Sequence, residues 1–445
     1  MKKTDSFDIL ITGGTLLTLS ADMEIIEKPV IGIRDGRIAM ITRGRDDGPM
    51  HYDAAESLDA SGCLILPGLI NTHNHLPMVC FRGLADDLPL MEWLQDRIFP
   101  AEAKYVNRDM VYAGARLAMA EMILSGTTTF CDGYFHESSV GHAAIDMGMR
   151  GVISQGFLDF ETMNQPDISK NIGIAEAFID KWQGRSALIS PAIFCHTPYT
   201  CATETLVSLK QVARQKQCLY ISHVAETIDE TTTMGDRYGT TSIRYLRNLG
   251  VLDEKTIVVH AVWVDQEELD IIHDSGAKVS HNPESNMKLA SGVAPVPAML
   301  RRGITVGLGT DGCASNNDLD LFREMGTAAR LHKVASMDPT VLDARTVLKM
   351  ATTGGARVLG MEDRIGSIEP GKCADLILVK MDQPHLTPMY QICSHLVYAA
   401  SGADVTASII DGKFVMKDRK LLHADLDDIM GQVRKIGAEI GRDGF

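Results

Sequence analysis

The sequence has no surplus of basic residues, no closely spaced cysteine pair and no long apolar run. Its 43 Lys and Arg residues are outnumbered by 58 Asp and Glu residues, which gives a formal net charge of −15. Because binding to nucleic acid phosphates requires a surplus of cationic side chains, this balance excludes nucleic acid as the main partner. The acidic balance does not by itself identify a substrate.

The cysteines and the first apolar stretch indicate in which cellular compartment the protein is expected. Nine cysteines occur, an odd number without a CxxC pair, so neither a disulfide framework nor a cysteine zinc cluster is indicated. No run of about 18 apolar residues occurs, and Gly13 and Gly14 break the first apolar stretch too early for a signal peptide. We therefore expect a cytoplasmic protein with reduced thiols and no membrane span.

The two ends of the chain share a β-rich texture. Short strand-like runs broken by Gly or Asp-Gly, a hairpin signal, occupy roughly the first 60 residues and return in roughly the last 80. The second of these regions contains the pair Asp411–Gly412. Two similar ends that flank a different middle predict one small β-sandwich domain built from residues 1–66 and 365–445.

The middle of the chain, residues 67–364, alternates apolar strand-like runs with amphipathic helical stretches, which is the pattern of βαβ units. Eight candidate strands occur, the number needed for a closed (β/α)₈ barrel of the TIM type. We therefore predict the α/β class, with a barrel and a small second domain. The candidate strands span residues 64–75, 127–134, 151–157, 188–199, 218–226, 256–263, 277–286 and 304–312.

Histidines and carboxylates recur at the C-terminal ends of these strands, where TIM barrels carry their active sites. Imidazole and carboxylate are the ligand types of catalytic divalent metals. Two of the histidines, His73 and His75, are two residues apart on the first strand, so both can project from one face into the barrel mouth. The later strands end in His196, His223 with Glu226, His260, His281 and Asp311.

Several sequence motifs carry a family resemblance. PGLINTHNH, SHVAET, VVHAVW, SHNPESNMKLASG and GLGTDG resemble the metal-site motifs of the amidohydrolase superfamily. AEMILSGTTTF, HTPYTC and GSIEPGKCADLILV extend the match to the 5′-methylthioadenosine/S-adenosylhomocysteine deaminase branch, beside guanine deaminases and s-triazine hydrolases. The resemblance runs from about residue 8 to about residue 420. It is more specific for the superfamily and its metal site than for the substrate.

The resemblance implies a metal site. By it, His73, His75, His223 and Asp311 bind one divalent ion per chain, with zinc as the expected metal and iron or manganese as alternatives. Relatives with two metals bridge them with a carboxylated lysine, commonly from the fourth strand, and the run 188–199 contains no lysine. We therefore expect a single metal, with water completing its coordination.

A hydrolytic deamination follows from this metal site. A divalent metal lowers the pKa of bound water from 15.7 to roughly 7–9, so metal-bound hydroxide is available near neutral pH. By the resemblance, hydroxide attacks an aromatic amidine carbon such as C6 of adenine, and ammonia leaves. Asp311 would accept the proton of the water, Glu226 would protonate the ring nitrogen, and His260 would hold the hydroxide.

The expected substrates are adenine nucleosides such as 5′-methylthioadenosine, adenosine or S-adenosylhomocysteine. The resemblance assigns Glu102 to the ribose hydroxyls and His196 to the purine, whereas His281 either contacts substrate or braces its loop. The segment 76–100 either forms an apolar lid or simply packs over the barrel mouth. The alternative function is a related C–N or C–Cl hydrolase acting on an s-triazine, guanine, an oxidised purine or a pterin.

Two other classes of function have to be weighed, and the subunit number stays open. The triplet around Asn74 resembles an HNH nuclease motif, but the acidic balance and the strand context oppose that interpretation. A non-catalytic barrel scaffold would be expected to have lost metal ligands, and all four are present. The predicted partner is a small heterocyclic molecule, and a homo-oligomer is compatible with the sequence.

The chain departs from S-adenosylhomocysteine deaminases just after the third strand, where those enzymes carry arginines associated with the amino-acid carboxylate of the substrate. Gln155 stands at the position expected for the first arginine, and no basic residue follows before Lys170. A carboxylate without its guanidinium partner loses roughly 1.5–3 kcal/mol, or one to two decades in affinity. The sequence therefore predicts a preference for an uncharged 5′ group.

Overall fold

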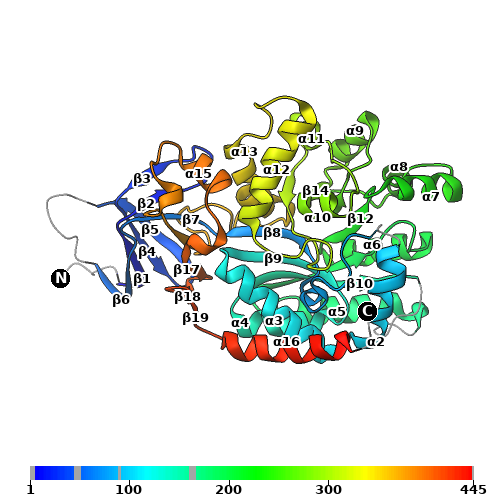
Figure 1. The fold of residues 1–445 in the computed structure, drawn as a ribbon, viewed down its shortest axis with the longest axis horizontal. Helices are drawn as coiled ribbons and strands as arrows, with labels where there is room; N and C mark the ends of the chain where they lie inside the picture. Colours follow the sequence, from blue (N-terminus) through cyan, green and yellow to red (C-terminus); the bar gives the residue numbers. More distant parts are fainter. Residues whose placement is uncertain (1–5, 45–51, 89–91, 160–166, 443–445) are drawn as a thin grey trace.

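The computed structural model describes residues 6–44, 52–88, 92–159 and 167–442, and its largest unit is a parallel barrel (Figure 1). Eight strands follow one another around this barrel in chain order. It closes where Thr72 on the first strand donates a hydrogen bond to the carbonyl oxygen of Leu308 on the last, at 2.9 Å. The strands are β8 (Leu69–Asn74), β9 (Thr127–Tyr134), β10 (Arg150–Phe157), β11 (Ile189–Cys195), β12 (Tyr220–Val224), β13 (Thr256–His260), β14 (Lys278–His281) and β15 (Val306–Leu308).

All eight predicted barrel strands are confirmed, but the first of them is divided. The stretch 64–75 separates at Gly68 into β7 (Cys63–Pro67) and β8, which belong to different sheets. A Cβ atom at Gly68 would lie 2.0 Å from Oγ1 of Thr128, so glycine is required where the chain enters the barrel. The seventh strand is shorter than expected, because Pro283 begins a helix two residues after it ends.

Helices surround the barrel and fill the connections between its strands. Local capping explains several of their starts, as where Asp265 and Glu268 form a reciprocal capping box. The helices of this part are η1 (Leu76–Phe81), η2 (Trp93–Ile98), α2 (Phe99–Tyr105), α3 (Arg108–Leu124), α4 (Glu137–Met147), η3 (Ile168–Lys170), α5 (Asn171–Trp182), α6 (Thr203–Lys216), α7 (Ile228–Tyr238), α8 (Ser242–Asn248), α9 (Gln266–Ser275), α10 (Pro283–Lys288), α11 (Val296–Arg301), α12 (Leu321–Ser336), α13 (Ala344–Lys349), η4 (Met350–Gly354) and α14 (Gly355–Val358).

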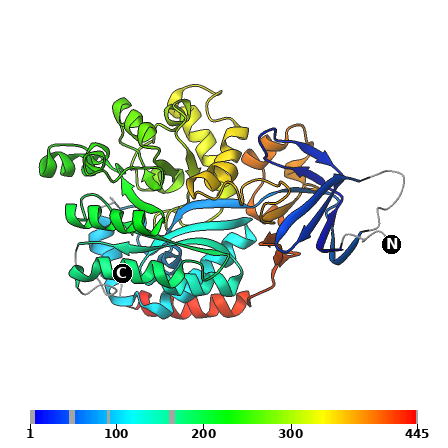
Figure 2. The ribbon, with the colours of Figure 1, turned by 180° about the vertical axis from the view of Figure 1, so that it is seen from behind.

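Both ends of the chain contribute to two further sheets beside the barrel (Figures 1 and 2). One sheet has the order β5-β4-β1-β6 and the other the order β19-β18-β17-β16-β7-β2-β3, so N-terminal β7 pairs with C-terminal β16. The strands are β1 (Ser6–Thr12), β2 (Thr15–Leu17), β3 (Ile25–Glu27), β4 (Pro29–Arg34), β5 (Arg37–Arg43), β6 (Asp53–Asp59), β16 (Leu376–Lys380), β17 (Val405–Ile410), β18 (Lys413–Lys417) and β19 (Lys420–Leu421).

The predicted hairpin signal is confirmed in these sheets. Asp411 and Gly412 join β17 to β18, and both have positive φ, 50° and 73°. Side chains from both ends, including Ile9, Ile31 and Ile409, share one buried core. This shared core supports our proposal that residues 1–66 and 365–445 form one domain and residues 67–364 another.

Two features connect the terminal sheets to the barrel. Arg150, at the start of β10, is buried and forms ion pairs with Asp375 at 2.6 Å and with Asp411 at 2.9 Å. Beyond the last strand, α16 (Leu426–Gly441) runs along barrel helix α3, as both views show (Figures 1 and 2). The remaining C-terminal helices are η5 (Pro384–Leu386), α15 (Ile392–Tyr398) and η6 (Gly402–Asp404).

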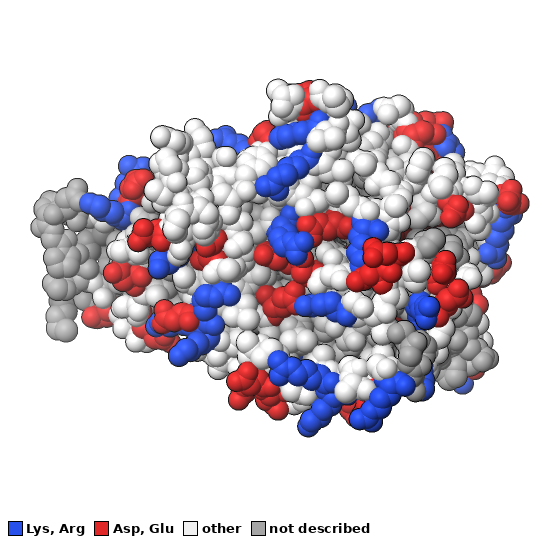
Figure 3. All heavy atoms as spheres, viewed as in Figure 1, with Lys and Arg blue, Asp and Glu red and all other residues white. Residues whose placement is uncertain are grey.

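Charged side chains and helix lengths describe the surface. Acidic and basic side chains are interspersed on the face shown in Figure 3. Among the described helices, none combines the length and apolar character needed to cross a bilayer.

Candidate metal centre and substrate pocket

Four predicted metal ligands converge at the C-terminal end of the barrel. His73 lies on β8, His75 directly follows it, His223 lies on β12, and Asp311 follows β15. Each of the four residues has one potential ligand atom, an imidazole nitrogen or a carboxylate oxygen, and these four atoms lie within 4.8 Å of one another. Strand ends separated by more than two hundred residues therefore build one four-donor cluster.

The protonation of these side chains fits a cation. Nδ1 of His75 lies 2.6 Å from the carbonyl oxygen of Gly133, so Nδ1 donates to that oxygen, and Nε2, 3.2 Å from Oδ1 of Asp311, is the nitrogen left for a metal. Burial lowers the pKa of His73 to about 4, and its Nε2 lies 3.1 Å from Nε2 of His223. Lone pairs that face one another at such distances are the expected arrangement around a divalent metal.

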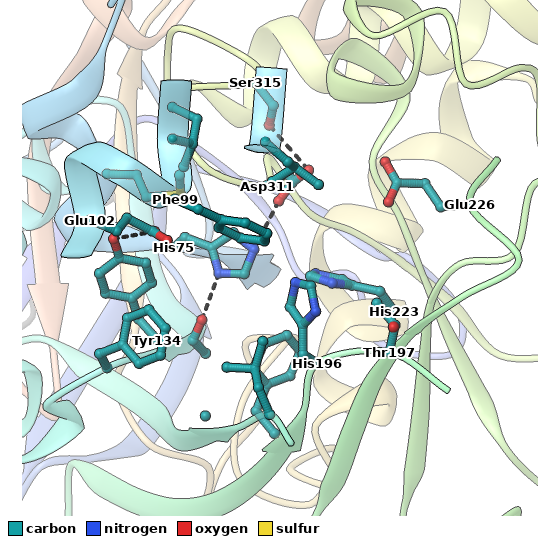
Figure 4. Close-up of a pocket in the computed structure, with 18 of the residues that line it drawn as sticks. His75, Phe99, Glu102, Tyr134, His196, Thr197, His223, Glu226, Asp311 and Ser315 are labelled. Carbon is teal, nitrogen blue, oxygen red and sulfur yellow. Dashed lines mark hydrogen bonds and ion pairs between the residues drawn. The ribbon is translucent and has the colours of Figure 1, made fainter. Parts of the chain in front are cut away.

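Asp311 is held in place by its neighbours (Figure 4). Its Oδ2 accepts hydrogen bonds from the hydroxyls of Ser285 at 2.7 Å and Ser315 at 3.2 Å. Burial opposes its charge, but the adjacent imidazoles of His73 and His75 hold the pKa of Asp311 well below its ordinary value. The cluster therefore combines three imidazoles with one ionised carboxylate, a donor set that suits zinc and other divalent transition metals.

Glu226 lies beside this cluster, two residues beyond the end of β12. Burial first, and then the charge of Asp311, raise the pKa of Glu226 to about 8, so this carboxyl group is protonated at neutral pH. Oε2 of Glu226 is 3.7 Å from Nε2 of His260, the last residue of β13. A protonated acid and an imidazole thus flank the metal ligands, an arrangement suited to general acid catalysis.

Glu102 and His196 line the same cavity. Glu102, on α2, is buried and accepts a hydrogen bond from the hydroxyl of Tyr134 at 2.5 Å. His196 follows β11, and its Nδ1 lies 2.9 Å from Oγ1 of Thr200. In the view of Figure 4, the metal ligands His75 and Asp311 lie between Glu102 on one side and Glu226 on the other.

The cavity has apolar walls and encloses about 810 Å³, counting the space at its open mouth. None of the described residues that line it is Lys or Arg. Polar groups are confined to the metal cluster, the two glutamates and a few neighbours. Its apolar wall includes Met78, Trp93, Leu94, Ile98, Phe99, Tyr134, Phe157, Leu158, Tyr199 and Leu289.

Two predicted substrate residues lie outside the set of residues that line this cavity. Gln155 is buried in β10, and its Nε2 donates to the carbonyl oxygen of Gly156 at 3.3 Å. Nε2 of His281 lies 3.0 Å from Nε2 of His332 on α12. The structure therefore brings Glu102 and His196 to the site but not Gln155 or His281.

The predicted lid segment is described in part. Residues 89–91 lie outside the described residues, whereas η1 and η2 contribute Met78 and Trp93 to the cavity wall. Asp86 is exposed, and its Oδ1 accepts a hydrogen bond from Nζ of Lys288 at 2.6 Å. This ion pair connects the segment after β8 to the segment after β14.

Several residues that help to build the site are not among those predicted from the sequence. Ser285 and Asn286 lie in the quoted motif SHNPESNMKLASG, which was the available signal, and they contact Asp311 and His260 respectively. Tyr134 ends the second barrel strand, the kind of position that marked the other site residues. Glu230, in the first turn of α7, accepts hydrogen bonds from the backbone N–H groups of Ala225 and Glu226.

Comparison with known proteins agrees with this geometry. The amidohydrolase family model matches residues 64–415. A 5-methylthioadenosine/S-adenosylhomocysteine deaminase of Syntrophobacter fumaroxidans is 47% identical, covering 97% of this chain and 98% of its own. A 5′-deoxyadenosine deaminase of Methanosarcina mazei is 42% identical, again covering 97% and 98%. A zinc-bound adenosine deaminase structure from Xanthomonas campestris is 35% identical with a TM-score of 0.96, covering 98% and 99%. The chain belongs to the amidohydrolase family.

Proposed function

We propose that this protein is a hydrolytic deaminase of adenine nucleosides that holds one zinc ion per chain. The observation that carries the proposal is the four-donor cluster beside a protonated Glu226 in an apolar cavity that also contains Glu102. The names of the similar proteins, which act on methylthioadenosine, S-adenosylhomocysteine, deoxyadenosine or adenosine, support this substrate class.

The metal would be held by His73, His75, His223 and Asp311, and when bound it would supply a water molecule activated for attack on an electron-poor ring carbon. Asp311 would take a proton from the attacking water at its carboxylate. Glu226 would deliver a proton from its carboxyl group to the ring nitrogen beside the reacting carbon. Loss of ammonia then needs a proton on the leaving amino group, which Asp311 can return. The last proton on the oxygen that came from water would restore the carboxyl group of Glu226, which leaves a ring carbonyl in the product.

Glu102 and His196, which line the same cavity, would orient the substrate. Glu102 has one oxygen occupied by Tyr134, and its second oxygen would accept hydrogen bonds from the ribose hydroxyls. The imidazole of His196 would contact the purine. Because burial lowers the pKa of His196 to about 3, this ring would do so in its neutral form.

The apolar cavity wall favours nucleosides with an uncharged 5′ group. S-Adenosylhomocysteine carries an α-amino acid, whose carboxylate would meet no Lys or Arg among the described lining residues. The missing charge-assisted pair corresponds to about one to two decades in affinity. We therefore propose 5′-methylthioadenosine, 5′-deoxyadenosine and adenosine as better substrates than S-adenosylhomocysteine.

The test is a measurement of ammonia release and kcat/KM on these four nucleosides with one preparation of zinc-loaded enzyme. We expect turnover of adenosine derivatives, with S-adenosylhomocysteine at least about tenfold poorer. Tenfold better use of S-adenosylhomocysteine would reject the specificity but not the deaminase. Absence of turnover with all four would reject the function and direct the search to guanine, pterins and s-triazines.

A further inference from the structure

Two asparagine side chains converge on one nitrogen of His260. Asn286 on α10 has its Nδ2 3.0 Å from Nδ1 of His260, and Asn282, which precedes the helix, has its Nδ2 3.3 Å from the same atom. All three side chains are buried. No step of the reaction described above uses either asparagine.

The direction of these hydrogen bonds follows from the chemistry of the groups. An amide nitrogen of asparagine can only donate, so Nδ1 of His260 has to accept. Since an imidazolium carries a proton on both nitrogens, a ring that accepts at Nδ1 is in its neutral form. A neutral imidazole carries a single N–H, and this proton is therefore on Nε2.

One of the two amides has a second partner. Oδ1 of Asn282 lies 3.2 Å from the hydroxyl of Ser280 on β14, so its oxygen faces that donor and its nitrogen faces His260. The amide of Asn286 then adds a second donor to the same ring nitrogen.

The other side of the ring faces the reaction centre. Nε2 of His260 lies 3.7 Å from Oε2 of Glu226, and the ring is in contact range of His73 and His223. With its proton on Nε2, His260 can donate a hydrogen bond to an oxygen held at the metal centre, but it cannot take a proton from that oxygen. Acceptance of the water proton is then left to Asp311.

We propose that Asn286, supported by Asn282, is a positioning residue that keeps the proton of His260 on Nε2 and makes this histidine a hydrogen-bond donor rather than a base. The inference rests on the proposed function for its catalytic meaning. The tautomer itself can be measured without any substrate, so the two can fail separately.

The direct test is ¹⁵N NMR of zinc-loaded enzyme labelled at histidine, in which protonated and unprotonated ring nitrogens have different shifts. The His260 signals are identified by their loss in the variant His260→Gln. We expect the proton on Nε2 in the native protein. A proton on Nδ1 would overturn the proposal, and this measurement requires no Asn286 variant to fold.

Two variants extend the test. In Asn286→Asp the new carboxylate can only accept, so the proton should move to Nδ1 and kcat should fall by about 10²-fold, as when one transition-state donor is lost. In Asn286→Ala, the amide of Asn282 remains, so the proton should stay on Nε2 with a smaller loss of kcat. Zinc content should equal that of the native enzyme in both variants.

The kcat and KM values of the two variants test whether the proton on Nε2 of His260 contributes to catalysis. A KM within about threefold of native together with lower kcat would mark a transition-state interaction. An Asn286→Asp enzyme that keeps the Nε2 proton, or that keeps native kcat after the proton has moved to Nδ1, would contradict the proposal. A native Nε2 proton in a protein inactive on every nucleoside would leave the tautomer established and reject the deaminase function alone.

Discussion

The backbone N–H of Glu226 donates a hydrogen bond to Oε2 of Glu230, with N and O 2.9 Å apart. The other carboxylate oxygen, Oε1, accepts from the N–H of Ala225 at 2.7 Å and from the hydroxyl of Ser242. Ala225 has φ = 55°, a conformation that non-glycine residues seldom adopt and that needs such support. Glu230 therefore fixes the turn that directs Glu226 to the cavity.

Glu230→Gln should lower kcat by up to about 10²-fold, because one amide N–H would oppose a backbone donor and displace Glu226. Zinc content and KM should change little. Glu267→Gln, the same change at an exposed position on α9, is the matched control and should behave as native. Equal kcat in the two variants would show that the turn does not depend on Glu230.

Glu226→Gln should retain zinc and lose about 10²-fold or more in turnover, because the amide keeps the shape but has no proton to transfer. His223→Ala should lose zinc itself, since it removes one of four donors. Elemental analysis beside steady-state kinetics separates the two effects. Native turnover in Glu226→Gln would exclude this residue as the acid.

The pH dependence of kcat follows from the pKa of Glu226, raised to about 8 by burial. The acid form is present below that value and is lost above it, so kcat should be constant near pH 7 and fall about tenfold per pH unit above pH 8. Residual activity of Glu226→Gln should lack this alkaline decline. A native profile that rises between pH 8 and 9.5 would contradict the assignment.

Removal of the metal should abolish activity and lower the melting temperature, because an ion that binds only the folded state stabilises it. Protein purified without added metal should contain one zinc per chain by elemental analysis. Activity should return when zinc is restored after chelation. Full activity of chelated, metal-free protein would reject the metal centre.

Arg150→Ala should destabilise the fold by about 3–5 kcal/mol, because it leaves the buried carboxylate of Asp375 without its partner. Arg214→Ala removes a half-exposed arginine from Asp253 and serves as the control, with an expected loss below about 1 kcal/mol. Denaturant unfolding of both variants provides the comparison. Losses of similar size would show that the contact between the barrel and the terminal sheet contributes little.

The barrel and its metal ligands could be predicted from the sequence, because strand ends in a parallel barrel converge wherever the chain has been in between. The orientation of Gln155 could not, since every residue of β10 is buried and no polar alternation marks the face that points into the mouth. The roles of Asn286 and Glu230 depend on which neighbouring strand end each helix covers. That information appears only when the elements are packed.

The position of α16 illustrates the same limit. Its buried residues, Ile429, Val433 and Ile440, predict an amphipathic helix, but nothing local distinguishes the barrel from the terminal sheets as the surface it covers. The structure places it on α3, so the last helix of the chain belongs by contact to the barrel.

The pairing of β7 with β16 has a consequence for biosynthesis. Cys63–Pro67 leaves the ribosome some three hundred residues before Leu376–Lys380, its neighbour in the sheet. The barrel is translated in between, so its eight strands can assemble while the N-terminal strands still present an unpaired edge. Completion of the small domain is therefore a late, long-range step, and a nascent chain stalled before residue 376 exposes a strand edge open to aggregation or chaperone binding.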